Sequence, residues 1–483
     1  MQDVPVIGAG PATAPTPTPV PLKLLKVEPS KGYVGDAFTI SGDGLAPGKP
    51  VTLLWVTVDG SYVMKATAEN VEFYERNFVE KRMPLGQATT DAQGRFSASL
   101  KAPEDFGEVH DIFAVVDNGD VARGGYRIMR NVTITPQEGP IGTPITIKMT
   151  GLGWKVYEST IALRYNNQPT GIITAVTTRG TATAHIRAAG PVGKHVLDFN
   201  HGAKSVPYLN NQQSGTAHIP DLRAWFTVTE SKGLPAFSLD WPDASRVASV
   251  SEAVKTTQGS AGGVLRSPGP TATLKPASGP ILSKAALNAS GLTPNSDVEA
   301  FWVTVRGNRV SPSGWSLNET SLLKARTDAN GVLAGTIQVP DDLGGWHVVK
   351  LVQGGKVVAD VPYYVEISLV DVTPTRVKAG ETFTIRIKGV GWTELTNGVA
   401  MTYDNAYIGF ACGFNSMGDV TVNLVATGAP GIHLVDLYPM IYQGHGKPPW
   451  GYQVPILSYK DDFPALSLGY KLPAVRLAIE VVP

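Results

Sequence analysis

Hydrophobic and polar residues alternate one by one along most of the chain. In the run 144–149 (PITIKM), the apolar side chains of Ile145, Ile147 and Met149 fall on one face, and the run 382–388 (TFTIRIK) has the same pattern. A period of two predicts half-buried β-strands. Asp-x-x-Gly turns such as TDAQG and TDANG separate strand-like runs, as expected for β-hairpins.

The pattern also repeats on a larger scale. Residues 135–198 and 373–436 are identical at 19 of 64 positions, at a constant offset of 238. Upstream, residues 89–110 match residues 326–347, and the first copy carries about ten extra residues before this match. The chain is therefore a duplication of a block of about 240 residues.

Each copy divides again into two parts that open with a strand, a proline, a short turn and an alternating strand. Short strands with a turn every 8–12 residues predict immunoglobulin-like sandwiches. We therefore expect an all-β fold, a tandem array of four such β-sandwiches in two homologous pairs, elongated and with separate small cores. The expected divisions are a Pro-rich arm (1–23), sandwiches at 24–130, 131–230, 271–366 and 367–483, and a linker (231–270) that contains the one helical candidate, 243–255.

Two of these parts share more specific motifs. TGLGW (150–154) matches KGVGW (388–392), and GKHVLD (193–198) matches GIHLVD (431–436). These motifs resemble the immunoglobulin-like repeats of bacterial exported proteins, including the IPT/TIG type. The resemblance implies the sandwich fold but no particular ligand, because such modules serve adhesion, spacing, carbohydrate binding and virion decoration alike.

Composition excludes several classes of protein. Lys and Arg number 41, as do Asp and Glu, so the basic excess that nucleic-acid binding needs is absent from the sequence. We expect no membrane span, because no apolar run approaches about 18 residues. A single cysteine, Cys412, excludes a disulfide within the chain and a thiolate zinc site.

The N-terminal region bears on the compartment. The Pro/Ala/Thr run 11–21 is typical of stiff spacers in secreted proteins, and no signal peptide is visible. Either a signal was removed or the protein is assembled in the cytoplasm, as a virion component would be. We expect the first, which makes the protein secreted, periplasmic or attached to a cell surface.

Catalytic motifs of metalloproteases, serine hydrolases and dinucleotide-binding enzymes are absent from the sequence, so we expect no enzyme activity, no cofactor and no metal. One histidine follows a glycine turn in each part and is either a metal ligand or a corner residue that bonds the preceding turn. Because a metal site needs several donors at one point, we expect structural corners. These histidines are His110, His195, His347 and His433. The acidic turns at 117–120 and 461–462 are expected to be solvated rather than calcium sites.

Recognition is expected where the two copies differ. The differing stretches are 61–87, 311–318 and 438–452, and they are rich in aromatic residues that suit contact surfaces. The alternative is that these loops fold back onto the protein. The candidate binding residues are Tyr62, Tyr74, Trp315, Tyr442, Trp450 and Tyr452. Tryptophans that recur at matching positions, such as Trp154 and Trp392, are expected to pack inside.

These observations predict a non-enzymatic, exported structural or adhesive protein. Its partners would be proteins or glycans at a cell surface or assembly, with self-association as a further expectation. Two alternatives remain open. One is a carbohydrate-binding accessory protein, and the other is a virion or filament subunit that assembles through its N-terminal arm.

Overall fold

The computed structural model describes residues 21–67, 69–155, 157–203, 206–215, 219, 221–231, 233–249, 269–307, 314–442 and 453–483. The Pro-rich arm up to residue 20 lies outside this range. Strands dominate, and the only helical elements of the described residues are three short 3-10 turns, so the all-β class is confirmed. Residues 244–246 of the helical candidate form a turn, residues 243–249 contain no helix, and residues 250–255 lie outside the described range.

The strands group into four consecutive segments, each with one three-stranded and one larger sheet. Segment 1 has sheets β2-β4-β7 and β1-β9-β8-β5-β6, with β3 beside β9. Its strands are β1 (Lys23–Leu24), β2 (Lys26–Glu28), β3 (Lys31–Gly32), β4 (Ala37–Gly42), β5 (Pro50–Ala66), β6 (Val71–Thr89), β7 (Phe96–Lys101), β8 (Glu108–Val116) and β9 (Gly119–Ile128).

Segment 2 has sheets β10-β12-β15 and β11-β18-β16-β13-β14, with β17 beside β16. Its elements are β10 (Asn131–Thr135), β11 (Glu138–Pro140), β12 (Pro144–Thr150), β13 (Thr160–Tyr165), β14 (Gln168–Thr174), β15 (Ala182–Arg187), β16 (Gly193–Ala203), β17 (Val206–Pro207), η1 (Asn211–Gln213) and β18 (Leu222–Thr229).

Segment 3 has sheets β20-β22-β25 and β21-β27-β26-β23-β24. Its strands are β20 (Thr271–Lys275), β21 (Ser278–Pro280), β22 (Lys284–Ser290), β23 (Asp297–Gly307), β24 (Trp315–Arg326), β25 (Leu333–Gln338), β26 (Gly345–Gln353) and β27 (Lys356–Glu366).

Segment 4 has sheets β28-β30-β33 and β19-β35-β34-β31-β32, with β29 beside β35, and its β19 comes from the linker. Its elements are β19 (Ser238–Asp240), β28 (Ser368–Thr373), β29 (Arg376–Lys378), β30 (Thr382–Lys388), β31 (Gly398–Tyr403), β32 (Ala406–Cys412), η2 (Phe414–Ser416), β33 (Val420–Val425), β34 (Gly431–Pro439), η3 (Pro464–Leu468) and β35 (Ala474–Val482).

The same topology recurs in all four segments. A short strand near the start, such as β11 or β29, runs parallel to the last strand of the larger sheet. In segment 1, β1 also pairs in parallel with β9, and the other described strand pairs are antiparallel. When the short parallel strands and β19 are not counted, the three-stranded sheet joins the first, second and fifth strands of each segment, which is the arrangement of an immunoglobulin-like sandwich. Each segment also has a cis X–Pro bond near its start, before Pro29, Pro136, Pro276 and Pro374.

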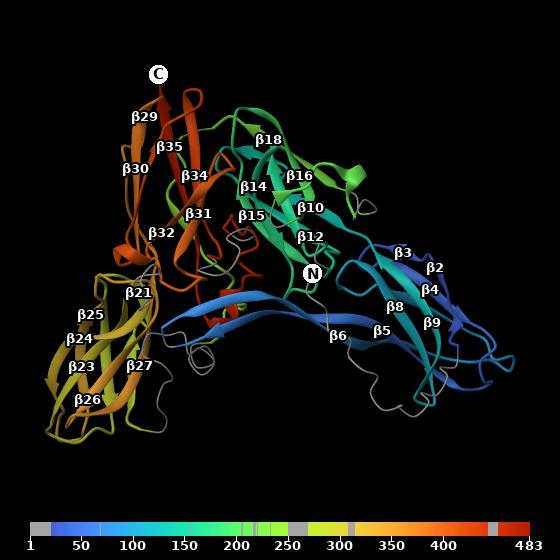
Figure 1. Ribbon diagram of the computed structural model, residues 1–483, viewed down its shortest axis with the longest axis horizontal. Helices are drawn as coiled ribbons and strands as arrows, with labels where there is room; N and C mark the ends of the chain where they lie inside the picture. The colour runs from blue at the N-terminus through green and yellow to red at the C-terminus, as the bar shows by residue number, and fades with distance from the viewer. Residues whose placement is uncertain are drawn as a thin grey trace, which may run out of the picture.

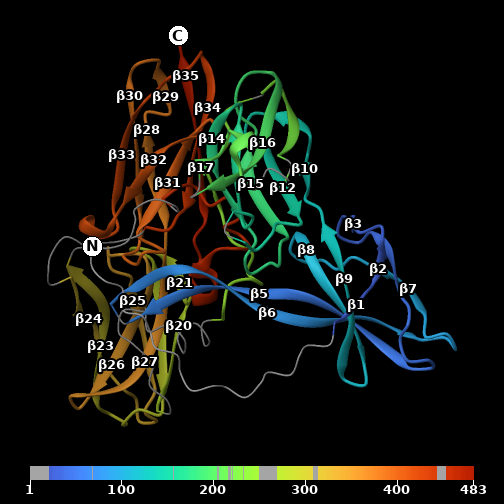
Figure 2. The same cartoon turned by 45° about the vertical axis from the view of Figure 1, so that its right-hand side comes forward.

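The cores are not all separate, which corrects one expectation. Segments 1, 3 and 4 each have a cluster of their own buried side chains. The core cluster of segment 2, however, includes Tyr438, Leu457 and Tyr459 from segment 4. Segments 2 and 4 therefore lie side by side and share apolar contacts, as Figures 1 and 2 show.

A long hairpin connects segment 1 with the second copy. Strands β5 and β6 pair from Pro50 and Thr89 to Ala66 and Val71, so the ten extra residues of the first copy lengthen a hairpin. This hairpin leaves segment 1 and runs across the molecule to segments 3 and 4 (Figures 1 and 2). The chain is consequently braced across its two copies.

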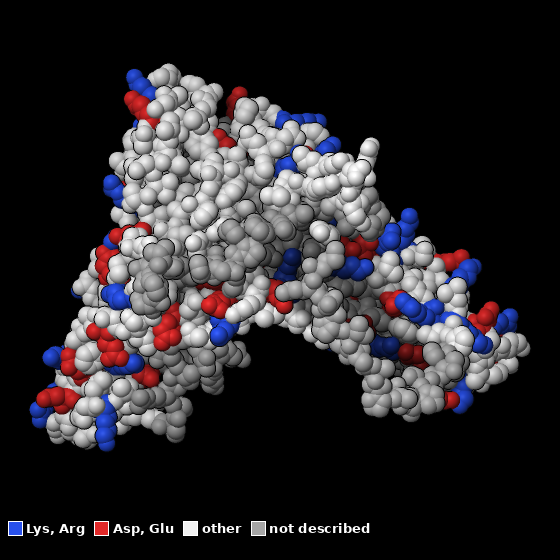
Figure 3. All heavy atoms as spheres, in the orientation of Figure 1, with Lys and Arg blue, Asp and Glu red and all other residues white. Residues whose placement is uncertain are grey.

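The part of the chain that the structure describes contains no helix long and apolar enough to cross a membrane. On the face drawn in Figure 3, acidic and basic side chains are interspersed rather than gathered in one field of a single sign.

Candidate interaction surface

The four recurring histidines have a common geometry. Each lies near the start of a strand that follows a glycine turn, and its Nε2–H donates to the carbonyl oxygen of the residue four positions earlier. The donor–acceptor distances are 2.7 Å for His110 and Phe106, 2.7 Å for His195 and Pro191, 2.8 Å for His347 and Leu343, and 2.9 Å for His433 and Ala429. Such a bond ties the strand to the turn before it.

The other ring nitrogen distinguishes segment 2 from segment 4. In segment 2, Asn166 Nδ2 donates to His195 Nδ1 over 2.7 Å, while Asn166 Oδ1 accepts from Val196 N–H. His195 Nδ1 is therefore the acceptor of this hydrogen bond. In segment 4, Asp404 Oδ2 lies 2.6 Å from His433 Nδ1. This hydrogen bond to Asp404 raises the pKa of His433, although partial burial opposes it.

In segments 1 and 3, the histidine belongs to a joint with the next segment. The ring of His110 stacks on Trp55 with centroids 4.4 Å apart, and Trp154 of segment 2 contacts its other side at 5.1 Å. In the second copy, the ring of His347 stacks on Trp302 with centroids 4.4 Å apart, and the ring centroid of Trp392 lies 5.5 Å from that of His347. Trp55, Trp302 and Trp392 thus pack inside the protein, and Trp154 is half-buried at the joint.

Two glycine pairs bring the backbones of adjacent segments together at these joints. Gly107 N–H donates to Leu152 O over 2.9 Å, and a Cβ at Gly107 would lie 1.8 Å from Gly151 O. In the second copy, a Cβ at Gly344 would lie 1.7 Å from Gly389 O. Both joints therefore exclude any larger residue, and each fixes the angle between two sandwiches.

The hairpin of segment 1 is held at its far end by segments 3 and 4. Phe73 N–H donates to Glu394 Oε2 over 2.7 Å, and Trp392 Nε1 donates to Glu69 O over 2.8 Å. Phe73 and Val71 are fully buried in a cluster with Trp346 and Tyr364 of segment 3 and Leu395 and Tyr470 of segment 4.

Most of the predicted binding residues that the structure describes take part in such internal contacts. Tyr62 donates to Asp462 Oδ2 over 3.0 Å, Trp315 packs against the cluster that contains Trp392, and Tyr442 N–H donates to Glu394 O over 2.7 Å. Only Tyr74 among these four is largely exposed, at 47%. Trp450 and Tyr452 lie outside the described residues. A ligand-binding role for these six residues stays a prediction.

The two acidic turns differ from each other. Asp117 and Asn118 form the tight turn between β8 and β9, both with positive φ. The expectation of a solvated turn is wrong for Asp462, which is fully buried and accepts hydrogen bonds from Val176 N–H and Thr177 N–H. Burial, together with the neighbouring Asp462, raises the pKa of Asp461 to about 7. Within the described ranges, no group of three or more His, Cys, Asp and Glu is arranged to hold a metal ion.

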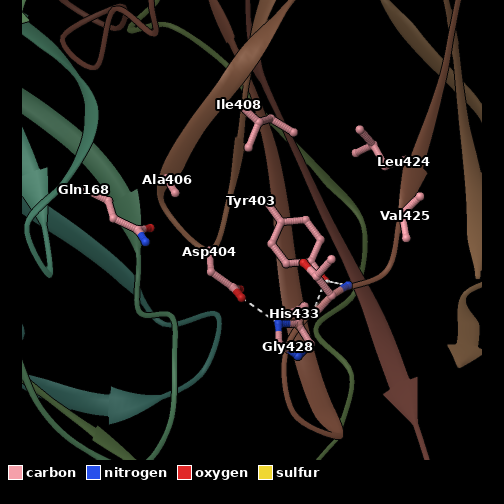
Figure 4. Close-up of a pocket in the computed structure, with 10 residues that line it drawn as sticks. Gln168, Tyr403, Asp404, Ala406, Ile408, Leu424, Val425, Gly428 and His433 are labelled. Atoms are coloured by element: carbon pink, nitrogen blue, oxygen red, sulfur yellow. Dashed lines mark hydrogen bonds and ion pairs between the residues drawn. The ribbon is translucent and has the colours of Figure 1, made fainter. Parts of the chain in front are cut away.

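Exposed apolar side chains gather on one side of segment 4, and sequence reasoning missed them. Ile408 and Phe410 on β32 are each 45% exposed, and Val425 on β33 is 51% exposed. Beside them is an open pocket of about 460 Å³ (Figure 4). Its lining includes Gln168, Tyr403, Asp404, Ile408, Leu424, Val425 and His433. Alternation alone places these residues on edge strands but does not tell which edges are covered.

Comparisons with known proteins find likeness only in structure. No protein-family model matches the chain, and no curated protein matches it in sequence. Among solved structures, the ectodomain fragment D1–D4 of ICAM-5 has 11% identity over 95% of this chain and 99% of that one, with a TM-score of 0.19. The Escherichia coli adhesin FdeC has 12% identity over 72% and 99%, with a TM-score of 0.16.

A third structure is a mutant of α2-macroglobulin of Salmonella, with 9% identity and a TM-score of 0.18. The match covers 94% of this chain but only 30% of the length of that protein. TM-scores this low carry no argument. The immunoglobulin-like assignment therefore rests on the sheet topology described above.

Proposed function

We propose that this chain is a non-enzymatic, exported structural or adhesive protein of the IPT/TIG-like kind that works by protein–protein contact. The observation that carries the proposal is the combination of a rigid frame with one exposed apolar side. Joints of backbone and aromatic contacts fix segments 1 and 2, and 3 and 4, while the β5–β6 hairpin braces the two copies. A frame of this kind suits a protein that holds a contact surface in a fixed place.

Protein contact is favoured over glycan binding by the placement of the aromatic side chains. A platform for a polysaccharide needs aligned, exposed rings. The exposed aromatic residues of the described chain lie instead on separate elements, among them Tyr33, Tyr74, Tyr157, Trp225 and Phe410. The apolar side of segment 4 combines Ile408, Leu424 and Val425, which suit the side chains of a protein better than a sugar.

Surface location and adhesion can be tested on cells of the source organism. An antibody against the folded chain should label intact cells, and brief trypsin treatment of those cells should remove the signal. A deletion strain should lose attachment or cell–cell adhesion, and the wild-type chain should restore it. Protein confined to the cytosol, or a deletion strain with unchanged adhesion, would contradict the proposal.

A further inference from the structure

The open side of segment 2 is filled by a stretch of segment 4. The sandwich of segment 2 is open between its edge strands β14 and β15. Ile172 N–H donates to Pro455 O over 2.8 Å, and Leu457 N–H donates back to Ile172 O over 2.8 Å. His185 N–H on β15 donates to Leu457 O over 3.1 Å. Residues 455–457 therefore add to both edges as a short strand would.

Apolar packing accompanies these backbone bonds. Leu457 is fully buried and belongs to the core cluster of segment 2. The approach is close, because a Cβ at Gly171 would lie 2.4 Å from Pro455 O and 3.0 Å from Leu457 Cγ. The inserted stretch thus completes a core that segment 2 does not complete with its own strands.

Segment 4 has the equivalent opening between β32 and β33, and the described residues leave it open. The offset of 238 pairs Thr170 with Ile408, Ile172 with Phe410 and Arg187 with Val425. The first residue of each pair is 0%, 0% and 5% exposed, and the second is 45%, 45% and 51% exposed. Gly171 corresponds to Gly409, where a Cβ would meet nothing within 4 Å.

The exposed residues of these three pairs, Ile408, Phe410 and Val425, are all large and apolar. Surface positions rarely combine such side chains in one patch unless something covers them. The pocket of about 460 Å³ lies along the same opening, between Ile408, Leu424 and the His433 corner (Figure 4). Segment 4 therefore presents the surface that segment 2 uses for the inserted stretch.

The sequence contains a second stretch like the one that fills segment 2. The filling stretch is Val454–Pro455–Ile456–Leu457. Val-Pro followed by two branched aliphatic residues occurs at one other place in the 483 residues, at Val4–Pro5–Val6–Ile7 in the N-terminal arm. A proline at the second position suits an edge partner, because the carbonyl that it contributes is the group used in segment 2.

We propose that Val4–Ile7 of a second copy of this chain inserts into the opening of segment 4 beside Ile408, Phe410 and Val425, as Val454–Leu457 does in segment 2. The arm leaves from β1 of segment 1, which lies on the opposite side of the molecule from segment 4 (Figures 1 and 2). Each chain has one arm and one such opening, so the contact joins unlike surfaces and produces head-to-tail chains. This inference deepens the proposed structural role and rests on it.

Sedimentation of the full chain at increasing concentration tests the proposal. We expect the weight-average mass to rise above the 51.2 kDa of one chain. Ile7→Asp in the arm and Ile408→Asp in the opening should each weaken association at least about tenfold, because a charge replaces a buried aliphatic side chain. Val192→Asp is the matched control, because Val192 is 65% exposed and lies outside the opening. It should behave as the wild type.

A mixture of the two variants separates a loss of binding from a loss of folding. The Ile7→Asp copy keeps an intact opening and the Ile408→Asp copy keeps an intact arm. An equimolar mixture should therefore form a dimer at concentrations at which neither variant associates alone. A synthetic peptide of residues 1–12 should bind the Ile7→Asp copy and block assembly of the wild type.

Two results would overturn the inference. One is a wild-type chain that stays at 51.2 kDa and an Ile7→Asp copy that does not bind the peptide. The other is a monomeric wild type whose Ile7→Asp variant does bind the peptide, because the arm then fills its own opening. Either result leaves surface labelling and adhesion unaffected as tests of the proposed function, and failure of those tests leaves the assembly result standing.

Discussion

Arg187 of segment 2 and Asp436 of segment 4 form a buried ion pair, in which Arg187 Nε donates to Asp436 Oδ2 over 3.2 Å. Arg476 Nη1 donates to the same carboxylate oxygen over 3.1 Å. All three side chains are at least 90% buried. Asp436 therefore bridges two guanidinium groups at the contact between the two copies, and Asp240 Oδ2 also accepts from Arg476 Nη2 over 3.1 Å.

Asp436→Asn should lower the free energy of unfolding by about 3–5 kcal/mol, because it leaves the buried Arg187 without its carboxylate and Arg476 with Asp240 alone. Asp198→Asn is the matched control, since Asp198 occupies the equivalent position. Its carboxylate pairs with Arg164, whose side chain is 15% exposed, over 3.5 Å and with Arg223, whose side chain is 59% exposed, over 2.6 Å. Water can solvate the guanidinium of Arg223, so the control variant should lose less stability than Asp436→Asn. Urea denaturation measures the free energy of unfolding of both variants. Equal losses of stability would show that burial of the ion pair does not determine its contribution.

The hairpin contact can be tested with two neighbouring residues. Phe73→Ala removes a fully buried ring and should destabilise the chain by about 3–5 kcal/mol. Tyr74→Ala removes a ring that is 47% exposed and should cost about 1 kcal/mol or less. Thermal denaturation and limited proteolysis of the hairpin report the effect. A Phe73→Ala protein as stable and as resistant as the Tyr74→Ala protein would show that the hairpin does not brace the copies.

The joints between segments depend on the absence of a side chain. Gly107→Ala and Gly344→Ala should each destabilise the protein by roughly 1–3 kcal/mol, because the new methyl group meets the backbone of the next segment. Gly119→Ala is the control, since its Cβ would lie 3.7 Å from the nearest atom, Val116 O. The melting temperatures of the three variants are compared. If Gly107→Ala and Gly344→Ala melt at the same temperature as Gly119→Ala, the joints are not rigid.

The His433–Asp404 pair predicts a dependence of stability on pH. The pKa of His433 is raised in the folded state, so the bond to Asp404 stabilises the protein fully below the ordinary histidine pKa of about 6.5. That stabilisation is lost as the pH rises through the raised value. The fall in melting temperature between pH 6 and 9 should therefore be smaller in Asp404→Asn.

The equivalent position provides the reciprocal variant. Asn166→Asp should give His195 the partner that His433 has, and should add a fall in melting temperature over the same pH range. Unchanged pH profiles in both variants would show that the partner of the histidine Nδ1 does not change how stability depends on pH.

Much of the fold follows from the sequence because its determinants are local. Alternation identified the strands, and the repeat placed one histidine after each glycine turn, where His110 and His347 now bond the residue four positions earlier. The contacts between the two copies, in contrast, depend on which surfaces from distant parts of the chain meet, and local patterns do not specify this. For the stretch 61–87, the sequence leaves open a recognition loop or a stretch that folds back onto the protein, and most of the stretch pairs within the hairpin β5–β6. The burial of Asp462 and the exposure of Ile408 could not be predicted for the same reason.

The insertion of Leu457 into segment 2 also has a consequence for the history of the chain. A single ancestral block would have had to close both of its sandwiches without help. In the present protein, the first copy alone would leave part of the segment 2 core in water, and the second copy alone would lose the hairpin that covers Leu395 and Tyr470. The two halves have become mutually obligate, so neither is expected to survive as an independent protein.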